Sequence, residues 1–115
     1  MKLDEIAAVL EARKLTPAVQ TDAVEVSAGF VSDLLSDVLA NAPKGGLLVT
    51  VQVHMNVVAV AVHAELAAVF FAAGRTPDDV VIARAEQENV ALFVSELPAF
   101  ELVGRLYQAR VRGQA

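Results

Sequence analysis

The chain has 115 residues, a formal net charge of −5 and no cysteine. That length fits one domain of roughly 100–150 residues, so we expect residues 1–115 to form a single domain. Without cysteine the chain has no disulfide, no thiolate zinc site and no cysteine nucleophile. The acidic balance argues against a nucleic-acid-binding protein, because such a protein needs a face rich in Lys and Arg to bind phosphates.

Apolar residues are more frequent than in an ordinary soluble domain. They make up 56% of the sequence before its 6 glycines are counted, whereas soluble domains average about 45–50% with glycine included. The apolar runs Val57–Val62 and Leu66–Ala73 are far shorter than the roughly 18–20 residues of a membrane span. We therefore expect no membrane segment. The surplus predicts a deep two-sided sheet, a subunit interface, or both. The first residues lack a signal-peptide pattern, which favours a cytoplasmic location.

The first quarter of the chain predicts a helix followed by a strand. Apolar residues recur over Leu3–Leu10 at three- and four-residue spacing, which predicts a helix that ends with Arg13 and Lys14. Apolar and polar residues then alternate over Val24–Ala28, as in a half-buried strand, and Gly29 stops this strand.

From residue 32 onward, helix signals and strand signals alternate. Thr76 and Pro77, followed by two acids, form the clearest helix start, because threonine caps helices and proline fits the first helical position. Leu66–Ala73 is continuously apolar, as in a strand buried on both faces. Leu34 and Leu39 are expected on the buried face of the first of these helices. The expected helices span 32–40, 76–88 and the region from 98 onward, and the expected strands span 47–53, 66–73 and 90–94.

The run Val57–Val62 fits two structures. Its valines favour a strand, and His54–Asn56 would then close a hairpin. A buried helix capped by Asn56 fits equally well. We prefer the helix, because strands and helices alternate everywhere else. The resulting fold class is α/β, a single domain with a mainly parallel sheet of about 4–5 strands and helices on both faces.

The candidate ligand site lies at the carboxyl ends of the expected strands, where open parallel sheets bind their ligands. His54 follows a strand and can exchange a proton near neutral pH. Arg75 and the next helix start could hold a phosphate, although Asp78 and Asp79 would repel it. Ordinary polar caps at a sheet edge explain the same residues. The candidate ligand-binding residues are Ser32, Gln52, His54, Asn56, Arg75, Thr76 and Ser95, and Asp33 and Glu96 lie on the same edge.

The sequence holds no strong catalytic or metal-binding pattern. The glycine patterns of phosphate-binding and dinucleotide-binding loops are absent. The serine–carboxylate pairs at 32–33 and 95–96 are adjacent in sequence and outside any nucleophile-elbow motif. His54 and His63 have no third ligand at a suggestive spacing. We therefore expect no enzyme activity, no metal and no cofactor.

A family pattern runs through the stretches Gly29–Val38, Leu48–Ala61, Val69–Pro77 and Val90–Phe100. These stretches resemble the DRTGG domain family, and the resemblance covers nearly the whole chain. The chain departs from the motif that names the family. Ala72-Ala73-Gly74 stands where Thr-Gly-Gly is expected, and His54-Met55-Asn56 lies near the expected Asp-Arg.

The resemblance implies a mainly parallel α/β domain, like the N-terminal domain of HPr serine kinase/phosphorylase, without kinase activity. Members of the family act as regulatory or dimer-forming modules. We therefore expect a non-catalytic regulatory or interaction domain that works as a homodimer, with Val57–His63 as the first candidate interface and Leu97–Leu106 as the second. The alternative is a sensor of a small molecule, such as an adenine nucleotide, bound near His54, Asn56 and Arg75.

Overall fold

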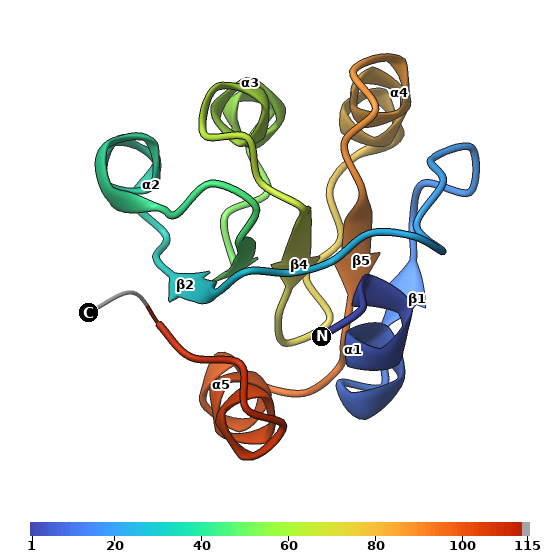
Figure 1. The fold of residues 1–115 in the computed structure, drawn as a ribbon. Helices are drawn as coiled ribbons and strands as arrows, with labels where there is room; N and C mark the ends of the chain where they lie inside the picture. Colours follow the sequence, from blue (N-terminus) through green and yellow to red (C-terminus); the bar gives the residue numbers. More distant parts are fainter. Residues whose placement is uncertain (114–115) are drawn as a thin grey trace.

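The computed structural model describes residues 1–113, in which a five-stranded sheet lies between two layers of helices (Figure 1). The strands are β1 (Arg13–Lys14), β2 (Gly29–Val31), β3 (Leu47–Thr50), β4 (Ala68–Phe71) and β5 (Leu92–Val94). Their order in the sheet is β1-β5-β4-β3-β2. The strands β2 to β5 are parallel neighbours in chain order, and β1 joins β5 in antiparallel orientation.

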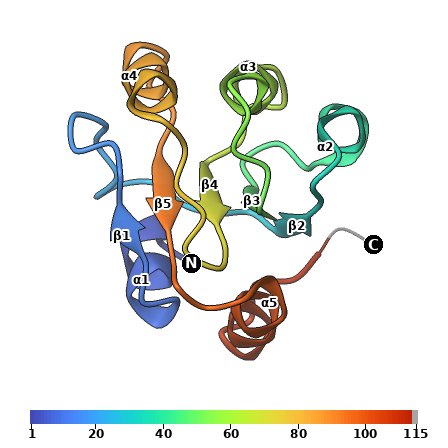
Figure 2. The ribbon, with the colours of Figure 1, turned by 180° about the vertical axis from the view of Figure 1, so that it is seen from behind.

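The helices are α1 (Leu3–Val9), α2 (Leu35–Asn41), α3 (Asn56–His63), α4 (Asp79–Gln87) and α5 (Ala99–Gln108). Helices α2, α3 and α4 cover one face of the sheet, and α1 and α5 cover the other (Figures 1 and 2). The three connecting helices share a face because each new strand is added in the same direction through a right-handed crossover. The expected α/β fold class, with a mainly parallel sheet and helices on both faces, is confirmed.

The central strands have two buried faces. Every residue of β3, β4 and β5 is buried. On the side of α1 and α5, the ring of Phe70 stacks on that of Phe93 with centroids 4.7 Å apart. On the side of α2 to α4, Leu48 and Phe71 belong to a second apolar cluster. This two-sided core takes up much of the apolar surplus in the composition. No helix among residues 1–113 is long and apolar enough to cross a membrane.

The ambiguous run Val57–Val62 is a helix, as we preferred. Within α3, Val57, Val58 and Ala61 are buried against the sheet. This spacing is that of a helical face, whereas a strand would alternate its burial. Asn56 is the first residue of α3 rather than its cap.

The prediction for Arg13 and Lys14 was wrong. The helix ends at Val9, and Glu11 takes a left-handed conformation with φ of 52°. The chain therefore reverses, and Arg13 and Lys14 form β1 opposite Val94 and Phe93. Sequence periodicity shows where a helix is amphipathic, but the partner strand that extends the sheet here lies about eighty residues further along the chain.

The predicted strand Val24–Ala28 is also wrong in position. Its burial alternates as expected, with Val26 and Ala28 buried, but it does not belong to the sheet. The N–H of Val26 donates to the carbonyl of Met1 instead. The strand β2 begins at Gly29, the residue expected to end it. A segment that lies along the rim of a domain has one buried side too, so alternation alone does not identify a sheet strand.

Two helix details also differ from expectation. Leu34 and Leu39 are 65% and 52% exposed, because α2 starts after Leu34 and directs Val38 inward. The helix α4 begins at Asp79 with Asp78 as its cap. Thr76 and Pro77 therefore precede the helix, and Pro77 is buried.

Four helices end on a residue other than glycine in the left-handed conformation. At the end of α3, Glu65 has φ of 53° and donates its N–H to the carbonyl of Val62. The N–H of Leu66 reaches the carbonyl of Ala61 and closes the last turn. This conformation normally favours glycine, since a Cβ atom crowds the following carbonyl oxygen. The residues with this role are Glu11, Glu65, Asn89 and Arg110, after α1, α3, α4 and α5.

We expect Glu65→Gly to raise the free energy of unfolding by about 0.5–1 kcal/mol, because it removes the Cβ clash at this helix end. Urea denaturation followed by circular dichroism measures the change. Glu65→Ala is the control, since it removes the exposed ion pair with Lys44 but keeps the Cβ. Equal stability of the two variants would contradict the strain at this position.

Candidate functional site

The loops after β2 and β3 are joined by one carboxylate. Asp33 Oδ1 accepts hydrogen bonds from Thr50 Oγ1 and from the N–H of Val51, both at 2.8 Å. Thr50 Oγ1 in turn accepts the N–H of Gln52 at 3.0 Å. Thr50 is buried at the end of β3. Asp33 therefore attaches the loop after β2 to the buried end of β3, where the ligand site was predicted.

His54 lies exposed on the connection between β3 and α3, and Asn56 is exposed as the first residue of α3. The N–H of His54 donates to Gln52 Oε1 at 3.1 Å, and His54 Nδ1 accepts the N–H of Asn56 at 3.0 Å. An accepting Nδ1 places the proton of the neutral ring on Nε2. The His54 imidazole therefore caps the start of α3, the role that we expected of Asn56, and the Asn56 side chain does not cap the helix.

Ser32 and Ser95 use their hydroxyl groups on the backbone. Ser32 Oγ accepts the N–H of Leu34 at 3.1 Å. Ser95 is buried, donates from Oγ to the carbonyl of Leu10 at 2.7 Å and accepts the N–H of Leu97 at 3.2 Å. Ser95 thus lies beneath the edge and attaches the end of α1 to the end of β5.

Arg75 and Thr76 follow a tight turn after β4. Ala73 and Gly74 have φ of 56° and 68°, and the N–H of Arg75 donates to the carbonyl of Ala72 at 3.0 Å. A Cβ atom on Gly74 would lie 2.3 Å from Glu96 Oε2, so no other residue fits there without a shift of that side chain. Both positions that correspond to the Gly-Gly of the family motif are therefore left-handed, and Ala73 adopts this conformation despite its Cβ.

The charges at this edge differ from one helix start to the next. Acids stand in the first turn of α2, α4 and α5, as Asp37, Asp79 and Glu101. The first turn of α3 has none. Because the positive end of a helix dipole attracts anions and nearby carboxylates repel them, an anionic ligand is least opposed at the start of α3.

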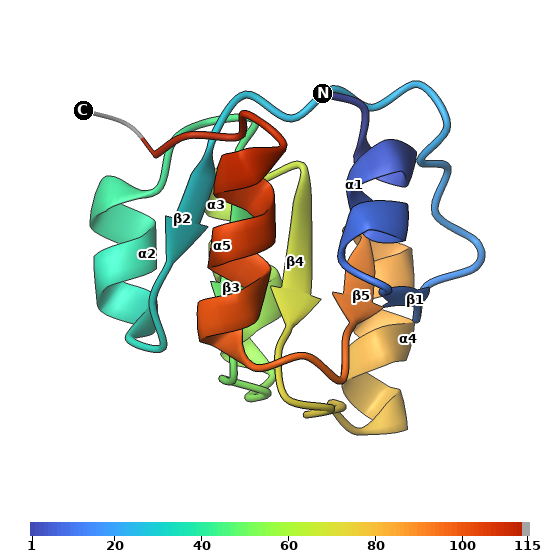
Figure 3. The ribbon, with the colours of Figure 1, turned by 90° about the horizontal axis from the view of Figure 1, so that it is seen from below.

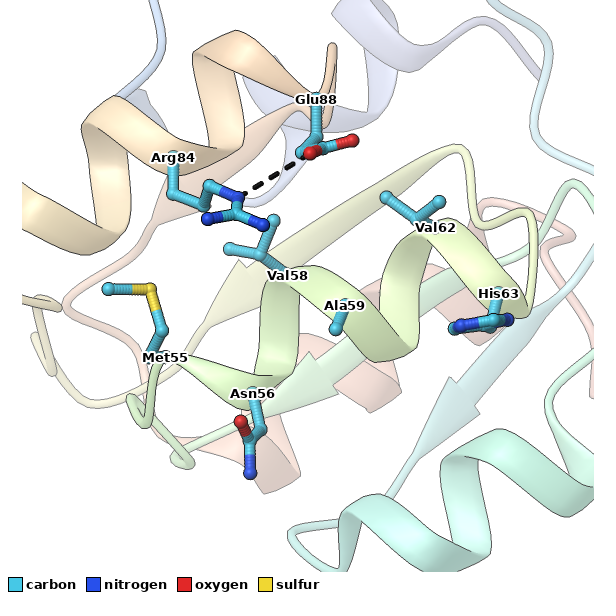
Figure 4. A pocket seen from close by; sticks show the side chains of 8 residues that line it. All are labelled: Met55, Asn56, Val58, Ala59, Val62, His63, Arg84 and Glu88. Atoms are coloured by element: carbon cyan, nitrogen blue, oxygen red, sulfur yellow. Dashed lines mark ion pairs between the residues drawn. The ribbon is translucent and has the colours of Figure 1, made fainter.

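A surface hollow of about 330 Å³ extends along α3 from its start to His63, and α4 borders it on one side (Figure 4). In this view Asn56 points away from Arg84 and Glu88. The guanidinium group of Arg84 reaches from α4 over Val58, and its Nε lies 3.4 Å from Glu88 Oε1. Arg84 and Glu88 were not among the predicted site residues, because their spacing of four residues indicates only an exposed helix face. Asn56 belongs both to the predicted set and to this hollow. Its lining residues are Met55, Asn56, Val58, Ala59, Val62, His63, Arg84 and Glu88.

Residues that could hold a metal ion do not cluster in the part of the chain that the structure describes. No group of three or more His, Cys, Asp or Glu side chains converges among residues 1–113. The predicted residues thus lie in three groups, at the start of α2, at the start of α3 and on the turn after β4, while Ser95 lies underneath.

Comparison with known proteins supports the fold. No family model matches the chain, and no curated protein matches it. Among solved structures, the chain is similar to the CBS and DRTGG domains of the regulatory region of Clostridium perfringens pyrophosphatase, complexed with the activator diadenosine tetraphosphate. The TM-score is 0.76 at 15% identity, over 94% of this chain and 46% of that one. At the level of the fold, the resemblance to a DRTGG domain is confirmed.

We expect Asp33→Ala to lower the free energy of unfolding by about 1–2 kcal/mol, since it leaves the buried Thr50 hydroxyl and the Val51 N–H without their acceptor. Chemical denaturation measures this loss. Asp37→Ala is the matched control, because Asp37 bonds only to Asn41 on the surface of the same helix. A similar decrease in the free energy of unfolding in both variants would show that the bonds of Asp33 to Thr50 and Val51 do not stabilise this region.

Proposed function

We propose that the chain is a non-catalytic regulatory module that binds a small anionic ligand of the nucleotide class and works as a homodimer. The observation that supports the regulatory role is the fold likeness to a regulatory region over 94% of the chain. That neighbour was solved with a nucleotide activator, which supports nucleotides as the first ligand class to test. A cytoplasmic location remains a prediction from the sequence.

The start of α3 is the favoured place for the ligand's phosphate. The helix dipole there is not opposed by an acid in the first turn. The exposed His54 and Asn56 offer hydrogen-bond donors, with Gln52 beside them. The turn with Arg75 and Thr76 is a weaker choice, because the carboxylates at the start of α4 follow it directly.

Arg84 supplies a cation across the hollow. Its ion pair with Glu88 is exposed, with 57% and 42% of the two side chains accessible. Such a surface pair is worth only about 0.3–0.5 kcal/mol, so a phosphate can replace the carboxylate at little cost. Ala59 and Val62 provide an apolar surface on α3 for a ring system.

Exposed apolar residues support the proposed homodimer. The first candidate interface, Val57–His63, directs Val57 and Val58 into the core, and both are almost fully buried. The second, Leu97–Leu106, includes Phe100, which is 90% exposed. An exposed aromatic side chain of this size favours α5 as the contact region.

We expect diadenosine tetraphosphate or ATP to raise the melting temperature, whereas adenosine without phosphate does not. A ligand at a hundred times its dissociation constant adds about 2.7 kcal/mol of stability. Calorimetric titration should then show that Asn56→Ala and Arg84→Ala each weaken binding about tenfold, because each removes a polar contact to the ligand.

Arg75→Ala is the matched control for Arg84→Ala, since it also removes one positive charge, but from the turn after β4. Binding that depends on Arg75 and not on Arg84 would place the ligand on the turn after β4. No thermal shift with any nucleotide at millimolar concentration would refute the sensor role.

A further inference from the structure

Helix α5 has a second apolar face that is largely exposed, and Arg112 lies over the Tyr107 ring at the end of this face. Its inward face buries Leu102 and Leu106. The outward stripe consists of Phe100, Val103, Gly104 and Tyr107, spaced as neighbours on one helix face. Phe100 is 90% exposed and Tyr107 is 60% exposed. With Val31 of the edge strand β2, the stripe lines an apolar groove of about 620 Å³ on the side of the sheet shown in Figure 3.

We propose that a second copy of this chain occupies the groove, with the two α5 helices packed antiparallel around a two-fold axis near Gly104. This inference rests on the homodimer of the proposed function and assigns its contact surface. The residues of each copy in the contact are Val31, Phe100, Val103, Gly104 and Tyr107.

The stripe is complementary to itself in the antiparallel orientation. A two-fold axis between Val103 and Gly104 sets Phe100 against the partner's Tyr107, and the reverse pair follows by symmetry. Both contacts are aromatic pairs, which are favourable beyond their buried area. The small residue lies where the two helix axes come closest.

The contacts within one chain do not explain why residue 104, inside helix α5, is a glycine. Glycine weakens a helix interior, and here it has an ordinary helical position in α5. A Cβ atom at this position would meet nothing within 4 Å. Space inside the chain therefore does not require glycine, whereas close approach of a second helix does.

The charges along α5 select a second copy in the antiparallel orientation. Glu96 and Glu101 lie before and within its first turn, and Arg110 and Arg112 lie beyond its last turn. The Arg112 guanidinium stacks 3.7 Å from the Tyr107 ring, which places it at the end of the stripe. In an antiparallel pair, the acidic start of each helix faces the basic end of the other. A parallel pair would bring like charges together.

The size of the patch fits a dimer of moderate strength. Aromatic side chains bury about 150–250 Å² each, and each copy brings two of them with three smaller residues. The total comes to the order of 1,000 Å², near the lower limit for a specific interface. We therefore expect a dimer that forms at micromolar concentration and dissociates on dilution.

The test compares Gly104→Lys with wild type by sedimentation equilibrium over a range of concentrations. We expect the variant to raise the dimer dissociation constant at least about tenfold, because the new side chain separates the two helices. The melting temperature of the dilute, monomeric variant should equal or exceed that of wild type, since lysine is the better helix former. Phe100→Lys, at a largely exposed position, should weaken the dimer to a similar degree.

Val80→Lys is the matched control, because Val80 is an equally apolar residue, 60% exposed on α4. This variant should keep the wild-type dissociation constant. A wild-type protein that stays monomeric at all concentrations would refute the homodimer itself. A dimer that tolerates both Gly104→Lys and Phe100→Lys would keep the homodimer and overturn the α5 contact.

Discussion

Burial of both faces of the parallel strands is the constraint on which the rest of the molecule depends. Parallel strands joined by helices leave neither face to water, and β3 to β5 are buried at every position. The helices α2, α3 and α4, which connect the parallel strands, cover one face of the sheet. The other face has to be covered by α1 and α5, from the two ends of the described chain (Figure 1). Val31, at the end of the edge strand β2, is still 52% exposed.

The buried strands and the crossover helices could be predicted because their signals are local. The run Leu66–Ala73 is apolar throughout. The run Val57–Val62 fitted a strand or a helix by itself, and the helix was preferred because strands and helices alternate elsewhere in the chain. Arg13 and Lys14 carried no such signal, because their strand exists only through its pairing with β5. The alternation in Val24–Ala28 predicted correctly which residues are buried. The prediction that this segment pairs in the sheet was wrong. Arg84 was missed for a similar reason, since its place beside α3 depends on how two helices pack.

The proposed ligand region and the proposed contact surface lie on opposite sides of the sheet. The start of α3 belongs to the layer with three helices, and the stripe on α5 belongs to the layer with two (Figures 1 and 3). A dimer formed through α5 therefore leaves both ligand regions open to solvent. Strand β3 contacts α5 on one side of the sheet and leads along the chain into α3 on the other, so it connects the two regions.

The hydroxyl of Ser95 has a consequence for the order of folding. It joins residues 85 positions apart, and Thr16 Oγ1 accepts the N–H of Leu92 over 76 positions. Contacts across such long loops form late, because the loop has to close before the bond can form. During synthesis, α1 can bond to residues 21–26 soon after it is made, but its attachment to Ser95 has to wait until β5 has followed. The attachment of α1 to the sheet thus depends on the last strand along the described chain.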